Sequence, residues 1–174
     1  MTRLNTNSVL FRYFAGIAEQ TFQGQLGVTD PSLIDYLSLL LFRFVRTEAV
    51  NKMRNLTGHR LLGVAEMLVE AKARQGTARR AAYRHIGDFT MFWAGVYPEA
   101  LRALQAADKK DHFIDYCQQG KRAYWIASQI PGDEEDASAE VLAQVSEDFA
   151  LCAYGLREVR REWEQPTEAK QLLM

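Results

Sequence analysis

The chain has 174 residues, of which 48% are hydrophobic and 25% are charged, and its formal net charge is −1. These values are typical of a globular domain that buries a core, and they exclude fibrous and disordered classes. A net charge near zero also provides no general attraction to nucleic acid or to an anionic membrane. We therefore interpret residues 1–174 as a single helical domain and expect residues 165–174 to form a flexible C-terminal tail.

Helical periodicity dominates the first third of the chain. Asn7 or Ser8 can cap a first helix, which the two glycines of the segment QGQLGVTDP then end. An acid followed by proline, Asp30-Pro31, predicts the start of a second helix that extends to about Asn55. Residues 33–45 are apolar nearly all round, which predicts a central helix, and they are too short to span a membrane.

Three further helices are predicted between residues 57 and 106. Thr57 can cap one that runs to Lys72, and another covers about residues 78–94. Proline lacks the N–H that a helix interior requires, so we place a break near Gly95-Pro98 and a short helix from Pro98 to about residue 106. Asp111 is predicted to begin the next helix, which ends at residues 130–132.

The clearest pattern in the chain follows the acidic linker at residues 133–136. Apolar residues recur there in steps of three and four over three heptads, which predicts a helix packed nearly parallel or antiparallel to a neighbour. We expect this seam to serve either the core of the chain or a homodimer. The whole sequence therefore predicts an all-α, single-domain bundle of six or seven helices. The seam contains Leu142, Val145, Phe149, Cys152, Leu156, Val159 and Trp163.

Metal binding is the first candidate chemistry. Helical bundles build metal sites from inward-facing acids and histidines, most often in Glu-x-x-His pairs, and this sequence contains no such pair. Glu48, His59, His85 and Asp88 could supply ligands if their helices met, but their spacing matches no standard ligand set. We therefore assign no metal and no cofactor.

The stretch RHIGDFTMFWAGVYPEAL places a polar pair in an apolar helix. His85 and Asp88 are three residues apart and share one face, and a buried Asp88 would require a hydrogen-bonding or charged partner. The natural partners are His85, tyrosine hydroxyls, or an arginine or lysine of an adjacent helix. We favour a structural anchor over an acid–base pair. Gly120 lies one turn from both Tyr116 and Tyr124, which predicts a shallow notch where a small ligand could bind.

These residues also carry a resemblance. The run Gly87-Asp88, Phe92, Gly95, Pro98-Glu99, followed by Asp115-Tyr116, Gly120 and Ala123-Tyr124, resembles a pattern of uncharacterised bacterial all-helical proteins. The similarity covers about residues 87–124 and brings no assigned activity. It implies that Asp88, Tyr116, Gly120 and Tyr124 belong to one packed polar cluster between two helices.

A basic segment precedes this cluster. Arg79, Arg80 and Arg84 lie in a stretch without acids, and the first two fall near the start of a helix, where an anion could meet side chains and free N–H groups. No nucleic-acid-binding motif is present, so we interpret the segment as a solvated loop, with a docking patch for an acidic partner as the alternative.

Catalysis receives no support from the sequence. There is no Gly-x-Ser-x-Gly motif, and neither Cys117 nor Cys152 forms a recognisable pair with a histidine, so we nominate no catalytic residue. Two cysteines also favour a reducing, cytoplasmic compartment. The sequence predicts a non-enzymatic interaction or regulatory module. The alternative is a small-molecule or metal-binding protein with its site around His85, Asp88, Tyr116 and Tyr124.

Overall fold

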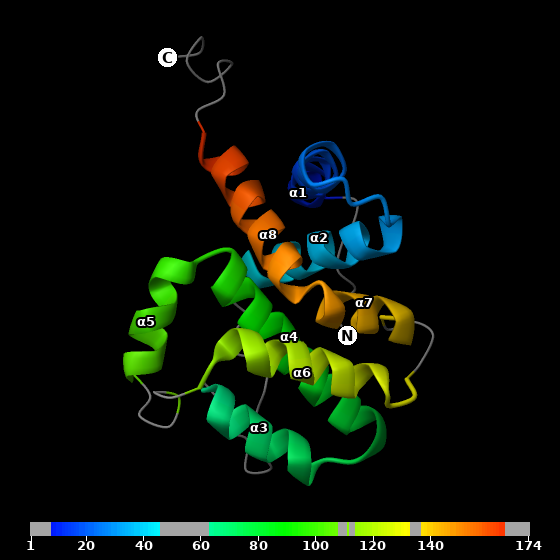
Figure 1. Ribbon diagram of the computed structural model, residues 1–174, viewed down its shortest axis with the longest axis vertical. Helices are drawn as coiled ribbons and strands as arrows, with labels where there is room; N and C mark the ends of the chain where they lie inside the picture. The colour runs from blue at the N-terminus through cyan, green and yellow to red at the C-terminus, as the bar shows by residue number, and fades with distance from the viewer. Residues whose placement is uncertain (1–7, 46–62, 108–110, 112–113, 133–136, 166–174) are drawn as a thin grey trace.

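The computed structural model describes residues 8–45, 63–107, 111, 114–132 and 137–165. Within these ranges the chain forms eight α-helices and one π-helical segment, and it contains no strand (Figure 1). The predicted all-α class is confirmed, and the number of helices is slightly higher than the six or seven predicted. No helix in the described ranges is both long and apolar enough to cross a membrane.

The first two helices begin where the sequence predicts. α1 (Val9–Glu19) starts after Ser8, whose hydroxyl accepts the N–H of Phe11 at 3.1 Å. It does not end at the first glycine but continues as the π-helical segment η1 (Gln20–Gln25), and the chain turns at Gly27, where φ is +68°. α2 (Pro31–Val45) buries nine of its fifteen residues, as a core helix does. The predicted continuation to Asn55 lies outside the described residues.

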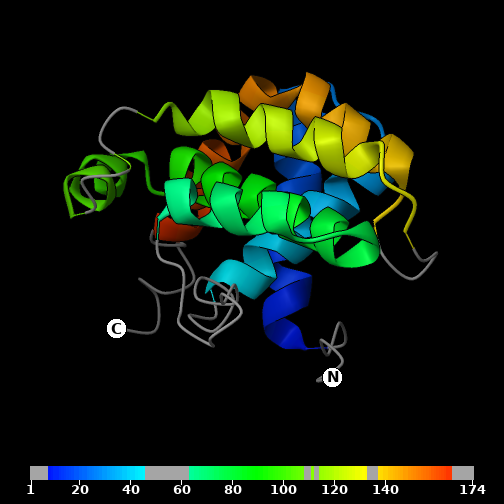
Figure 2. The ribbon, with the colours of Figure 1, turned by 90° about the horizontal axis from the view of Figure 1, so that it is seen from below.

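α4 (Gly76–Gly95) is the helix around which the others assemble (Figures 1 and 2). It packs against α2, α3 (Val64–Ala73), α5 (Pro98–Ala107), α6 (Tyr116–Ser128) and α8 (Phe149–Glu164). The predicted break between Gly95 and Pro98 is confirmed. Arg160 of α8 stabilises it, since its Nη1 donates to the Val96 carbonyl at 2.8 Å, near the C-terminal end of α4.

The start of α6 corrects one prediction. Asp111 does not begin this helix; the N-cap is Asp115, whose carboxylate accepts the N–H of Gln118 at 3.1 Å. Asp111 is instead buried at the start of α3, where it accepts the N–H groups of Val64 and Ala65, both at 2.8 Å. An aspartate near a helix start is a capping signal, but the sequence does not say which helix it caps. The predicted cap of α3, Thr57, lies outside the described residues.

The predicted heptad helix is two helices, α7 (Ala139–Glu147) and α8. They meet at Asp148, whose φ of −96° and ψ of 26° depart from helical geometry and turn the chain. From Leu142 to Val159 the apolar seam is buried inside the chain, and Trp163 packs on Phe14 of α1 at 5.2 Å between ring centroids. The seam therefore belongs to the core of this chain.

Candidate functional site

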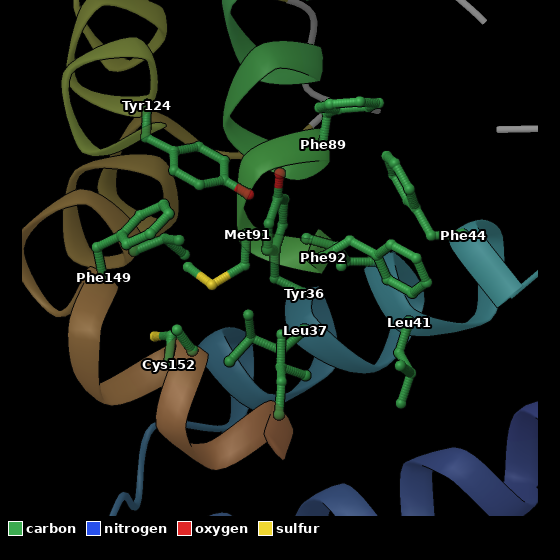
Figure 3. Packing of buried hydrophobic residues seen from close by; sticks show 14 of the residues in the cluster. Tyr36, Leu37, Leu41, Phe44, Phe89, Met91, Phe92, Tyr124, Phe149 and Cys152 are labelled. Carbon is green, nitrogen blue, oxygen red and sulfur yellow. The ribbon is translucent and has the colours of Figure 1, made fainter. Parts of the chain in front are cut away.

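Asp88 is the centre of a polar cluster in the core. Its side chain lies on α4 and the residue is 2% exposed. The hydroxyls of Tyr36 from α2 and Tyr124 from α6 both donate to Oδ1, the latter at 2.6 Å. Figure 3 shows the two phenol groups pointing toward the same space beside α4. One carboxylate therefore connects three helices.

Two arginines complete the cluster. Arg43 of α2 donates through Nη2 to Asp88 Oδ2 at 3.0 Å. Arg84, one turn before Asp88, places Nε at 3.9 Å from the same oxygen and donates to the Tyr36 hydroxyl at 3.2 Å. Both carboxylate oxygens are thus occupied by groups of the chain itself. The five side chains hold one negative and two positive charges.

The protonation states follow from this geometry. Burial alone would raise the pKa of Asp88, but the charges of Arg43 and Arg84 and the two tyrosine hydrogen bonds lower it below its ordinary value. Burial and the charge of Asp88 raise the pKa values of Tyr36 and Tyr124. At neutral pH the aspartate is therefore ionised and both tyrosines are neutral. A group that exchanges a proton in catalysis needs a pKa near the operating pH, and none of these three acids has one.

Two glycines allow α4 and α6 to approach closely. A Cβ on Gly87 would lie 2.7 Å from the Tyr124 ring, and a Cβ on Gly120 would lie 2.1 Å from the Thr90 hydroxyl and 2.8 Å from the Phe149 ring. The notch predicted beside Gly120 is therefore filled by side chains of the core. Gly87 matters to the site itself, because only a bare backbone leaves room for the ring that delivers the Tyr124 hydroxyl to Asp88.

The structure distributes the predicted ligand-binding residues between separate places. Asp88 and Tyr124 are hydrogen-bonded, and Gly120 lies in the same α4–α6 contact. Tyr116 instead donates its hydroxyl to Asp111. The ring of His85 lies against Phe44 at 6.0 Å and Phe89 at 6.3 Å between centroids, on the side of α4 that faces α2.

Sequence reasoning missed Tyr36 and Arg43. They are seven residues apart on α2 and therefore share one face of that helix. A positive charge within a strongly apolar run was the available signal, because a buried arginine requires an acidic partner. Nothing in the spacing indicated that this partner would be Asp88.

The basic segment does not act as one patch. Arg80 is buried and donates to the Ala137 carbonyl, Arg84 belongs to the Asp88 cluster, and Arg79 lies over the Tyr83 ring at 5.7 Å. The three predicted anion-binding residues therefore point to three different surroundings.

The metal hypothesis can be tested only in part. Among the described residues, no group of three His, Cys, Asp or Glu side chains could hold a metal ion. Two of the four candidate ligands, Glu48 and His59, lie outside those residues. His85 and Asp88 are described, and their surroundings are given above.

The chain was also compared with known proteins. No protein-family model, no curated protein and no solved structure matches it. Its function has to be inferred from the geometry of its own residues.

Proposed function

We propose that the chain is a non-enzymatic interaction module that self-associates through the outer face of α1 and η1. The observation that carries this proposal is that two exposed side chains of opposite charge, Arg12 and Glu19, lie on either side of Gly16 on this face. A twofold-symmetric interface requires a surface whose two halves match when one copy is rotated onto the other. The following contacts and exposures support that arrangement.

The outer face of α1 exposes apolar side chains near its N-terminal end, and a hollow lies where α1 continues into η1. Val9 is 83% exposed and Tyr13 is 47% exposed, although large apolar side chains on an isolated surface helix are usually turned inward. Gly16 lies about one turn after Tyr13 and Gly24 about three turns after it, and both border a shallow, open hollow of about 460 Å³. A Cβ on either glycine would meet nothing within 4 Å. A glycine in a helix costs about 1 kcal/mol relative to alanine, and neither glycine gains a close contact inside the chain in return.

The charges on this face are arranged about Gly16. Arg12 and Glu19 are seven residues apart, so they share the face with Gly16 between them. In an antiparallel pair of α1 helices that cross at Gly16, each Arg12 would meet the Glu19 of the second copy. Each Tyr13 would meet the hollow at Gly16 and Gly24. Neither Arg12 nor Glu19 forms an ion pair with any residue that the structure describes.

The Asp88 cluster has a different part in this proposal. Its hydrogen bonds hold α2, α4 and α6 together, and α2 supports α1 from below through contacts such as that between the Phe11 and Phe42 rings, 5.6 Å apart. The alternative, a small-molecule site around His85, Asp88, Tyr116 and Tyr124, would require a ligand to displace one of these internal partners. The saturation of both Asp88 oxygens therefore favours a structural role for the cluster.

A cytoplasmic setting is part of the proposal. Cys117 is exposed and Cys152 is buried, and neither forms a disulfide. Free thiols, one of them at the surface, are typical of a reducing compartment.

Sedimentation velocity across a range of protein concentrations tests the proposal. We expect a reversible monomer–dimer equilibrium. Arg12→Glu and Glu19→Arg should each weaken the dimer by about tenfold, because each places like charges opposite one another twice in a symmetric pair. The double variant Arg12→Glu/Glu19→Arg should restore association, since it exchanges the two charges and keeps the complementarity.

The matched control is Arg102→Glu, the same substitution on the exposed face of α5, which should leave association unchanged. Gly16→Leu should abolish the dimer and leave the helical content of the monomer intact, because its side chain enters open space. A chain that sediments as a monomer at every concentration would overturn the proposal. So would a double variant that associates no better than the single ones.

A further inference from the structure

A second hollow lies between α3, α4 and α6, on helices that the proposed α1 interface does not include. It has a volume of about 140 Å³. Its floor is apolar and includes Ala123 and the ring of Tyr83, whereas its rim carries Lys72 from α3 and Arg122 and Gln119 from α6. Lys72 and Arg122 thus come from two different helices and border the same small space.

The charged residues that line this hollow are all positive. None of its lining residues is acidic. Lys72 and Arg122 form no ion pair within the described part of the chain, and both are exposed at the surface. Cations held near one another without an acid repel each other, and an anion bound between them would remove that repulsion.

Arg79 adds a third positive charge. Its guanidinium lies over the ring of Tyr83, which forms part of the hollow's wall, at 5.7 Å from the centroid. Its Nε is buried and has no hydrogen-bond partner among the described residues. This atom is too deeply buried to contact a ligand in the hollow, so Arg79 contributes through its charge and not through a hydrogen bond from Nε.

The acids on the neighbouring turns are already engaged. Glu70, which precedes Lys72 on α3, accepts from Arg74 Nε at 3.2 Å. Asp115, one turn before Gln119, caps α6 through the N–H of Gln118. The acids nearest in sequence to the hollow therefore form contacts within their own helices, and no acid among them neutralises Lys72 or Arg122.

The size of the hollow limits what can occupy it. Pockets that enclose a whole drug-sized ligand have volumes of about 300–1,000 Å³. A space of about 140 Å³ suits a single small anionic group. Arginine and lysine are the side chains that most often bind phosphate oxygens, arginine through paired N–H donors and lysine as a point charge.

We propose that this hollow is a binding site for a phosphate group, held by Lys72 and Arg122 with the Gln119 amide as a further donor, and that the nearby charge of Arg79 adds to the attraction. The group is either inorganic phosphate or the phosphate of a small phosphomonoester. In both cases the same oxygens contact the same cations, and a phosphomonoester would extend from the hollow into solvent.

Isothermal titration calorimetry at constant ionic strength tests the site. Inorganic phosphate is one titrant, glycerol 3-phosphate is the second, and sodium chloride is the ionic control. We expect saturable binding of phosphate with one site per chain, and tighter binding of glycerol 3-phosphate if a phosphomonoester is the ligand. Lys72→Gln and Arg122→Gln should each weaken binding by about tenfold, because each removes one charge-assisted contact. Arg79→Gln should weaken it as well.

Lys121→Gln is the matched control, since it removes one exposed positive charge next to Arg122 in sequence but outside the hollow. It should leave the affinity within about twofold of the wild type. Equal weakening by Lys121→Gln would show a diffuse attraction and overturn the site. Heat indistinguishable from the sodium chloride control at phosphate concentrations up to about 10 mM would also overturn it. Circular dichroism of each variant shows whether a loss of binding comes from a loss of fold.

Discussion

Asp88 and Asp111 are two buried carboxylates that the chain stabilises in different ways. Each accepts a hydroxyl from a tyrosine of α6, Tyr124 for Asp88 and Tyr116 for Asp111. Beyond that, Asp88 faces the two guanidinium groups described above, whereas Asp111 accepts two backbone N–H groups at the start of α3. The first carboxylate is compensated by full charges and the second by the partial charges of a helix N-terminus.

The difference shows how each aspartate depends on its surroundings. The arginines around Asp88 carry full positive charges, and they lose the compensation that Asp88 provides if its carboxylate is neutralised. The N–H groups around Asp111 are neutral, and any side-chain oxygen of the right reach can still accept from them. We therefore expect the same substitution to have a larger effect at Asp88 than at Asp111.

Asp88→Asn should produce the largest effect, a loss of about 3–5 kcal/mol in the free energy of unfolding, because Arg43 and Arg84, whose side chains are only 19% and 20% exposed, would lose the carboxylate that compensates their charges. Urea unfolding at pH 7 measures it. Asp35→Asn, the same change at an exposed position of α2, should stay within about 0.5 kcal/mol of the wild type. A loss below about 1 kcal/mol for Asp88→Asn would contradict the view that the carboxylate stabilises the fold by compensating the charges of the two arginines.

Tyr124→Phe should cost about 2 kcal/mol, since it removes a hydrogen bond to a charged acceptor and keeps the ring that packs on Gly87. The same urea experiment measures it, and Tyr154→Phe, at a half-exposed tyrosine of α8, is the control. Combining Tyr124→Phe with Tyr36→Phe should give a loss that differs from the sum of the two, because both hydroxyls bind Oδ1. Strict additivity would contradict a shared cluster.

Asp111→Asn should cost about 1–2 kcal/mol, because the amide oxygen can still accept one N–H of α3 while the second loses its acceptor. Asp115→Asn, at the exposed N-cap of α6, should change stability by only a few tenths of a kcal/mol, since asparagine caps helices as well as aspartate does. Urea unfolding ranks the two. A loss at Asp111 as large as that at Asp88 would remove the distinction between the two sites.

The pH dependence of the free energy of unfolding should give the smallest effect, measured per pH unit. The pKa of Asp88 is lower in the folded state than its ordinary value of 3.8, so the unfolded chain binds the proton more readily. The stability contributed by the ionised carboxylate is therefore complete above about pH 5 and falls as the pH decreases through the folded-state pKa. Below pH 4, Asp88→Asn should lose stability less steeply than the wild type, by at most about 1.4 kcal/mol per pH unit. Identical slopes would contradict the lowered pKa.

Much of the helical framework could be predicted from local patterns. The starts of α1 and α2 follow from Ser8 and Asp30-Pro31, and the break before α5 follows from Pro98, because capping and proline geometry act within one turn of the chain. The apolar seam followed from its periodicity, but whether it served the core of the chain or a homodimer did not. The pattern did not predict the change of direction at Asp148, since an apolar spacing of three and four can continue across two successive helices.

The candidate sites were less accessible to such reasoning. A buried Asp88 was expected to pair with His85, with tyrosine hydroxyls or with a basic residue of an adjacent helix. The structure supplies two tyrosine hydroxyls and two arginines, and His85 is not among the partners. Which tyrosine and which arginine of another helix would reach Asp88 did not follow from the spacing. The three arginines of the basic segment look alike in sequence. Their separate positions depend on which helix lies beside each one, because successive residues of a helix point about 100° apart.

The sequence by itself determined which segments are helical, where several of them begin and which faces are apolar, because these properties depend on residues within one or two turns of each other. Only the tertiary structure decided which residues contact Asp88 and Asp111. It also decided that Lys72 and Arg122 line the same hollow. The contacts of the two aspartates join residues that are 4 to 52 positions apart, and only those with Arg84 and Tyr116 are local in sequence. They depend on how closely and at what angle the helices cross, which side-chain volumes and the bare backbones of Gly87 and Gly120 set together.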